Sequence, residues 1–208
     1  KSFKNNRGKG IYSLLEEGSS NLSNIPLKYP LSEAKVVSLS GEIFVRRDYF
    51  ACQNLLERMA KRDIIVKRSH LFEWTNYIDY TVENKIIDSG FDLKGNIEFN
   101  LKLILQKKFE KKIKKILSKS GLYDYELIDM EKIIEYGKNF FDVRFTGESI
   151  LVAGSFFKDI LHTVQGVISI GPFGCMPARV IESVLSVESS METKLLLERD
   201  KEHYGKFK

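Results

Sequence analysis

The sequence has only two cysteines, four prolines and one tryptophan in 208 residues, and it lacks long apolar runs. No stretch approaches the roughly 18 apolar residues that a membrane-spanning helix needs, so we expect no membrane partner. The basic N-terminus is not followed by an apolar segment, which argues against a signal peptide. These absences favour a cytoplasmic location. Because the chain begins at Lys1 rather than at a methionine, we expect it to be a fragment of a larger protein.

The sequence is also poor in metal-ligating and catalytic patterns. Two thiols, Cys52 and Cys175, cannot complete a four-cysteine iron–sulfur or zinc site by themselves. A structural disulfide between them is not expected in a cytoplasmic chain. The histidines, His70, His162 and His203, show no metal-ligand spacing, and the chain has no GxxxxGK[ST], GxGxxG, GxSxG or HExxH motif. Any metal site must therefore take ligands from outside this chain.

Positive charge is in modest excess, with a net charge of +5, and seven lysines fall within residues 107–119. A nucleic-acid binder would add arginines and exposed aromatic residues to such a run, so we expect no nucleic-acid partner. Apolar residues at helical spacing predict an amphipathic helix with a solvated lysine face. The alternative is a basic surface that meets acidic partners or CoA phosphates. The apolar positions are Phe99, Leu101, Ile104, Leu105, Phe109, Ile113, Ile116 and Leu117.

Short β-branched runs at 35–39, 64–66 and 166–170 predict buried parallel strands. A helical pattern within 49–62 lies between the first two of these runs. The two strands and this helix together have the length of a βαβ unit. The alternation of strands and helices predicts an α/β fold, with a mostly parallel sheet flanked by helices. Further helices are expected at about 97–118, 130–141 and 147–161, and from the GPFGCMP loop through Val187.

The composition along the chain predicts its domain organisation. Residues 1–33 have weak periodicity and a loop rich in serine, asparagine and proline, so we interpret them as a connecting segment. Residues 34–190 form the predicted α/β domain, with a helical insertion at about 97–142. Residues 191–208 are the expected C-terminal tail, whose METKLLLERD segment could be a last strand or a helix.

The loop GPFGCMP after the last predicted strand is the first candidate site. Gly171 and Gly174 would permit backbone angles that other residues avoid, and Pro177 suits the first turn of a helix. Cys175 is then expected at a helix N-terminus, where free N–H groups favour a thiolate. Such a thiolate could ligate iron, act as a nucleophile or cycle through redox states. The alternative is an inert thiol in a tight turn, and for Cys52 we expect a small buried residue.

The loop GEIFVRRD after the first predicted strand is the second candidate site. Ligands of open parallel sheets bind beyond the carboxyl ends of the strands, so the two loops have reason to meet at one edge. The adjacent guanidinium groups of Arg46 and Arg47 could grip a phosphate or carboxylate. Alternatively, the two arginines could form a surface ion-pair cluster with Glu42 and Asp48. The FEWTNYIDY run could line a pocket, or could place Trp74 in the core beside a capped turn.

Four motifs occur in order between Ala34 and Leu185: GEIFVRRD, EWTNY, GESILVAG and GVISIGPFGCMPARVIESVL. Together they resemble the C-terminal region of bacterial CoA-substrate-specific enzyme activases. These proteins are relatives of the 2-hydroxyacyl-CoA (2-hydroxyglutaryl-CoA) dehydratases and of their ATP-dependent activators. GPFGCMP is the most specific element of the resemblance.

The resemblance implies a flavodoxin-like or Rossmann-like fold and a role in electron transfer. In such systems an actin-like ATPase with an iron–sulfur cluster passes one electron to a partner that holds a [4Fe–4S] cluster. By this resemblance Cys175 is a candidate cluster ligand. The same comparison places the candidate ligand-binding residues Glu42, Arg46, Asp48, Gly171, Phe173, Gly174 and Pro177 around the site.

The ATPase part and the other cysteine-bearing segments of the family are not in this sequence, so we do not expect catalysis by this chain alone. We expect a module of a dehydratase activator-like protein that contributes to an iron–sulfur electron-transfer site completed by ligands outside the chain. Its expected partners are the remaining domains of the parent protein and a dehydratase or an ATPase. The alternatives are a non-redox binding module for an acidic ligand such as a CoA moiety, or a structural docking domain.

Overall fold

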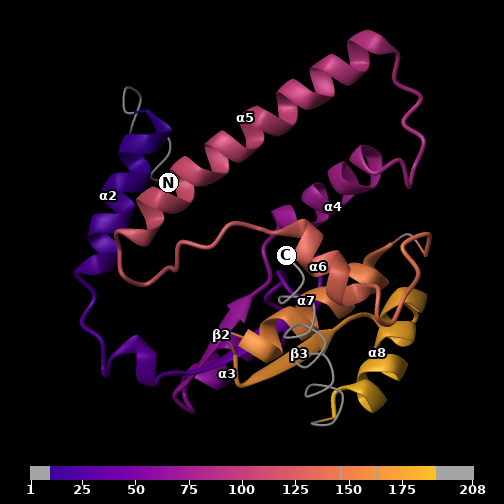
Figure 1. Cartoon of the computed structure of the whole chain (residues 1–208). Coiled ribbons are helices and arrows are strands. Elements are labelled where there is room, and N and C mark those ends of the chain that lie inside the picture. Colours follow the sequence, from indigo (N-terminus) through magenta and orange to yellow (C-terminus); the bar gives the residue numbers. More distant parts are fainter. Residues whose placement is uncertain (1–9, 146, 163, 191–208) are drawn as a thin grey trace, which may run out of the picture. The chain divides into compact units, whose positions relative to one another are not determined.

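The computed structural model describes residues 10–145, 147–162 and 164–190 (Figure 1). The backbone divides into two compact units, one formed by Lys1–Glu33 with Ser89–Ile128 and the other by Ala34–Asp88 with Asp129–Lys208. The expected C-terminal tail, including METKLLLERD, lies outside the described residues. The first unit contains α2 (Ile11–Ser23), η1 (Leu31–Glu33) and α5 (Leu93–Ser118). The second contains β1 (Lys35–Gly41), α3 (Leu55–Ala60), β2 (Ile64–Arg68), α4 (Phe72–Glu83), α6 (Met130–Gly137), α7 (Glu148–His162), β3 (Gly166–Ile170) and α8 (Met176–Glu188).

In the first unit, α2 packs against the C-terminal part of α5. The hydroxyl of Ser19 donates a hydrogen bond to the carbonyl of Ile116 at 2.8 Å. The ammonium group of Lys112 lies 3.6 Å from the centroid of the Tyr12 ring, a cation–π contact that ties the two helices together. Residues 11–23, within the predicted connecting segment, are therefore helical and have a partner.

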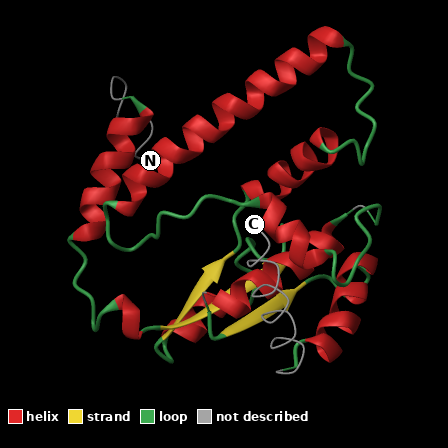
Figure 2. Ribbon diagram, in the orientation of Figure 1, coloured by secondary structure: helices red, strands yellow, loops and turns green. Residues whose placement is uncertain are grey.

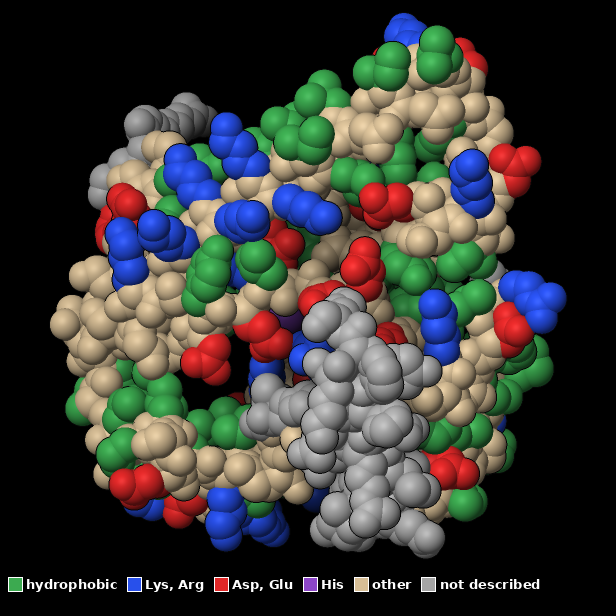
Figure 3. Space-filling model, viewed as in Figure 1, with side chains coloured by type: hydrophobic (Ala, Val, Ile, Leu, Met, Phe, Trp, Pro, Cys, Tyr) green, Lys and Arg blue, Asp and Glu red, His purple; other side chains and the backbone are tan. Residues whose placement is uncertain are grey.

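The predicted basic helix is α5, which begins where the Asp92 carboxylate accepts a hydrogen bond from the N–H of Gly95. It carries eight lysines and two glutamates, a net charge of +6 against +5 for the entire chain. Lysines and apolar side chains lie together on the face shown in Figure 3. Leu101, Ile104 and Phe109 remain more than half exposed. The apolar face of α5 is therefore not packed along its whole length. The charge excess of the chain is thus concentrated on one helix.

In the second unit, the three strands form a parallel sheet in the order β2–β1–β3, with helices around it (Figure 2). The register pairs Val37 with Val66 and Leu39 with Ile168. All three predicted strands are confirmed, and the fold is α/β with a parallel sheet flanked by helices. Leu39 is completely buried because β1 has a neighbouring strand on both sides.

The segment after β1 differs from the sequence prediction. The predicted helix within 49–62 is reduced to α3, and residues 43–54 form successive turns. Gln53 and Asn54 have positive φ angles of 48° and 55°, which interrupt a right-handed helix at this point. Phe50, within the range of that predicted helix, is 90% exposed. The turns lengthen the loop at the carboxyl end of β1.

The core of this unit lies between α6, α7 and α8. Phe157 is completely buried, and its ring stacks on that of Phe140 with centroids 4.4 Å apart. Gly154 lets α7 approach α6 closely, since a Cβ there would lie 2.0 Å from the carbonyl oxygen of Ile133. The predicted insertion at 97–142 spans α5 and α6, and these two helices belong to different units. The buried core residues are Tyr136, Val152, Phe156, Phe157, Ile181 and Leu185.

Candidate functional site

The two loops singled out in the sequence begin side by side at the carboxyl edge of the sheet. β1 and β3 are parallel neighbours, and the N–H of Glu42 donates to the carbonyl of Ile170 at 2.8 Å. Gly41 has a φ of +106°, and a Cβ at this position would lie 2.0 Å from the same carbonyl oxygen. Only glycine fits here. The expected meeting of the two loops at one edge is therefore confirmed, at the type of edge where open α/β sheets bind ligands.

Cys175 is the N-cap of α8, as the sequence predicts. Its φ and ψ of −81° and 108° are not helical, and its carbonyl accepts the N–H of Arg179 at 3.0 Å. Its own N–H donates to the carbonyl of Pro172 at 3.1 Å, which closes the loop. Pro177 lies in the first turn of the helix, where a missing N–H costs no hydrogen bond. The thiol is free and half-buried. It is thus held on a hydrogen-bonded turn and remains partly accessible.

The other residues of this loop have different roles from those expected. Neither Gly171 nor Gly174 has a positive φ angle, so neither uses the backbone freedom that glycine permits. Gly171 is needed for space, since a Cβ there would lie 2.8 Å from that of Ala178, whereas the position of Gly174 is open. Phe173 is 89% exposed, with the guanidinium of Arg179 at 5.8 Å from its ring centroid. The loop therefore presents an aromatic residue to the surface.

A pocket of about 400 Å³ opens between β3 and α8, next to this loop. Gly171 lies at its margin, and Arg179 and Glu182 form an ion pair in its wall. Cys175 is not among the described residues that line it. The thiol therefore faces a surface other than this pocket.

The carboxylates of Glu42 and Asp48 hold the loop after β1 in shape. Glu42 accepts a hydrogen bond from the N–H of Val45, and Asp48 accepts one from the N–H of Ala51, both at 2.7 Å. The thiol of Cys52 donates to the carbonyl of Val45 at 2.9 Å and is buried. Burial raises the pKa of this thiol. The prediction of Cys52 as a small buried residue is confirmed, and the two carboxylates act within their own turns.

The two adjacent arginines lie in different environments. Arg46 is only 4% exposed and interacts with Glu73, Glu148 and Glu42. Burial lowers its pKa, and the three carboxylates oppose that effect. Arg47 is exposed, and its Nη2 donates to the carbonyl of Ser69 at 2.6 Å. The structure therefore separates the pair: Arg46 faces internal carboxylates, and it does not share an external anion with Arg47.

Glu73 lies in the FEWTNYIDY run, which the sequence suggested could line a pocket, but the sequence reasoning did not identify its altered titration. It is 8% exposed, and burial raises its pKa to about 7, although the charge of Arg46 opposes the shift. Its carboxylate also accepts a hydrogen bond from the N–H of His70. Burial likewise raises the pKa of Glu148, at the start of α7. Both glutamates lie in two of the four ordered motifs, Glu73 in EWTNY and Glu148 in GESILVAG. Their positions in these motifs were the sequence signal that could have identified them.

The described residues form no cluster of metal ligands at this edge. No group of three or more histidine, cysteine, aspartate or glutamate side chains in the described part of the chain is arranged to hold a metal ion. Within the same residues, no helix is both long and apolar enough to cross a bilayer. Comparisons with protein-family models, with curated protein sequences and with solved structures return no match. The geometry of the two loops and their motifs therefore carry the functional argument.

Proposed function

We propose that this chain is a cytoplasmic, flavodoxin-like electron-transfer module of a 2-hydroxyacyl-CoA dehydratase activator-like protein. In this proposal Cys175 supplies one ligand to a [4Fe–4S] cluster, and residues outside the chain supply the others. The supporting observation is that Cys175 caps α8 beside the β1–β3 edge as a half-buried, free thiol. The activator resemblance of the surrounding GPFGCMP motif points to the same residue.

A donor set of one thiol fits a cluster that is shared between chains or domains. Cys52 cannot join it without leaving its buried position and its hydrogen bond to Val45. An iron–sulfur cluster bound by cysteine thiolates supplies one-electron transfer, with a potential set by its hydrogen bonds and its exposure to solvent. The contribution of this chain would be to hold the Cys175 thiol on a hydrogen-bonded turn.

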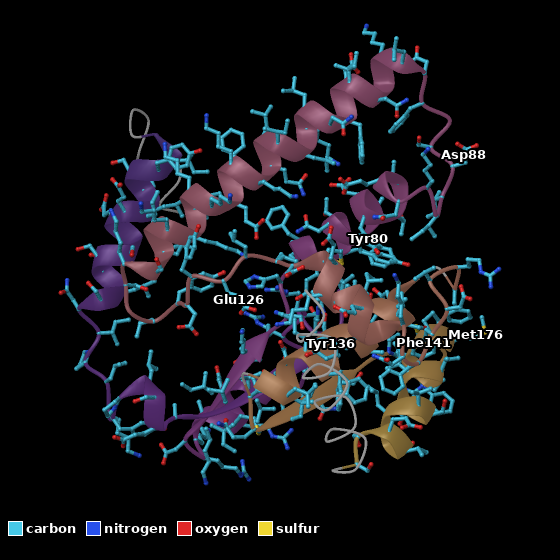
Figure 4. The ribbon with its side chains drawn as sticks, viewed as in Figure 1. Tyr80, Asp88, Glu126, Tyr136, Phe141 and Met176 are labelled. Carbon is cyan, nitrogen blue, oxygen red and sulfur yellow. The ribbon has the colours of Figure 1, made fainter. Side chains whose placement is uncertain are left out.

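The residues around the thiol also favour a partner surface. Phe173 is 89% exposed, and Met176 is 73% exposed. Met176 lies at the start of α8 (Figure 4). Phe44, in the neighbouring loop, is exposed too. Exposed apolar side chains at this edge would suit a surface that another domain covers. Such a cover would shield a cluster from water and bring the missing ligands.

The alternative of an arginine pair that grips an acidic ligand finds less support. Arg46 is enclosed by three carboxylates, so an added anion would meet negative charge beside it. Arg47 is the exposed one of the two arginines, and it bonds the carbonyl of Ser69. A bidentate guanidinium clamp would need both side chains to face the ligand. The thiol-centred proposal therefore agrees better with the geometry of the two loops.

The test uses the full-length protein that contains this chain, prepared without oxygen, with Cys175→Ala and Cys52→Ala compared. We expect Cys175→Ala to lose most of the bound iron and sulfide together with the visible thiolate-to-iron absorption band. Cys52→Ala, the matched control, should keep both. Far-UV circular dichroism establishes that each variant is folded. An unchanged cluster in folded Cys175→Ala would refute the proposal.

A further inference from the structure

A polar layer lies between β1 and α7, where a parallel sheet usually packs with apolar side chains. Ser38 and Ser40 are both 1% exposed and point to the same face of β1, because side chains alternate along a strand. The hydroxyl of Ser38 donates to the carboxylate of Asp159 on α7 at 2.6 Å. Ser155, also buried, lies one turn before Asp159 on the same face of that helix. Serines from the sheet and from the helix therefore face one another in the interior.

Four polar atoms of this region have no hydrogen-bond partner among the described residues. They are the hydroxyls of Ser40, Ser69 and Ser155 and the Nε of Arg46. Ser69 lies beside Ser40, because its N–H bonds the carbonyl of Leu39 at the end of the β1–β2 ladder. A buried polar group without a partner costs about 1–3 kcal/mol, so four of them in one region point to a ligand that pairs with them. Internal water molecules form hydrogen bonds with such buried hydroxyl and N–H groups.

The carboxyl of Glu73 borders this layer. From α7 it meets Asp159, which is bonded to Ser38, and Lys158. From the loop after β1 it meets Arg46, and it also interacts with Arg47. Arg46 in turn also interacts with Glu148 and Glu42, so Glu73 is not its only carboxylate partner. Burial raises the pKa of Glu73 to about 7, and the carboxyl can therefore gain or lose a proton near neutral pH.

We propose that this polar layer is an internal water site and that Glu73 exchanges a proton with bulk water through it. On protonation, an O–H bond forms at the Glu73 carboxylate, and the water that donates the proton is reprotonated by its neighbour. The proton that enters this chain of transfers comes from a hydronium ion in the solvent, which becomes a water molecule. Deprotonation runs in the opposite direction. Ser40, Ser69 and Ser155 fix the waters, and Arg46 stabilises the ionised form of Glu73. No metal or cluster is needed for this exchange.

The test of proton exchange is the infrared carbonyl band of protonated carboxyl groups, recorded against pH for the whole chain. We expect a band that titrates near neutral pH in the wild type and is missing in Glu73→Gln. Glu135→Gln, which removes an exposed carboxyl from α6 of the same unit, should keep it. A wild-type spectrum without such a band, or a band that persists in Glu73→Gln, would overturn the assignment. If Glu73→Gln does not fold, carbon NMR of the wild-type carboxyl groups, assigned through the backbone, gives the same readout.

The water site has its own test, a crystal structure of the chain at a resolution that shows ordered solvent. We expect water molecules within hydrogen-bond distance of the Ser40 and Ser69 hydroxyls and of the Arg46 Nε. A region with clear density for these side chains and no water between them would overturn the proposal. Since neither experiment involves iron, failure here and failure of the cluster proposal are distinguishable.

Discussion

The buried carboxyl of Glu73 should make the stability of this protein depend on pH, and Glu73→Gln tests that dependence. Glutamine keeps the shape of the side chain and removes its titration. The pKa of Glu73 rises from its ordinary 4.5 to about 7 on folding. Since each pKa unit corresponds to about 1.4 kcal/mol, the pH-dependent part of its contribution is about 3 kcal/mol.

The sign follows from proton binding. Between pH 4.5 and 7 the folded chain keeps the Glu73 proton and the unfolded chain has lost it, so the free energy of unfolding falls as pH rises. The stability that this carboxyl contributes is complete below pH 4.5 and is lost as pH rises through 7. Glu73→Gln lacks this dependence. Its destabilisation relative to the wild type should therefore be about 3 kcal/mol smaller at pH 8 than at pH 4.5.

The measurement is urea unfolding at the two pH values, followed by circular dichroism and by the fluorescence of Trp74, the single tryptophan. Coincidence of the two signals establishes a common transition. Glu135→Gln serves as the control and should show no comparable change between the two pH values. A destabilisation by Glu73→Gln that is equal at both values, or larger at pH 8, would refute the reasoning. The second result would mean that the ion pair with Arg46 outweighs burial.

Two further predictions concern the fold. Gly41→Ala should destabilise the chain by more than about 2 kcal/mol in thermal unfolding, because its φ is +106° and the added Cβ would clash with the Ile170 carbonyl. The control Gly174→Ala, whose added Cβ would lie in open space, should change stability by less than about 0.5 kcal/mol. Equal effects of the two substitutions would contradict the close approach of β1 and β3. Phe157→Ala should cost about 3–5 kcal/mol in urea unfolding because Phe157 is completely buried in the core, and exposed Phe173→Ala should cost little. A small cost for Phe157→Ala would show that this core is loosely packed.

Sequence reasoning succeeded where the signal is local. Runs of β-branched residues identified the three strands, and the GPFGCMP pattern placed Cys175 at the start of α8. It failed in the turns after β1, where Gln53 and Asn54 have positive φ angles. Asparagine adopts such angles more readily than most residues, but glutamine does not, so the residue type of Gln53 gives no sign of this turn. It considered the backbone freedom of Gly171, whereas the structure needs a glycine there because the side chain of Ala178 lies close by.

The sequence by itself determined the α/β alternation, the strands and the two loops that follow β1 and β3, since these depend on periodicity and on glycine and proline within a few residues. Only the tertiary structure decided that Arg46 turns inward to Glu73, Glu148 and Glu42, while Arg47 stays exposed. Ser38 and Asp159, which join the sheet to α7, are separated by 121 positions. Burial and charge act through space, so no local pattern shows which distant groups surround a carboxyl or how far its pKa moves.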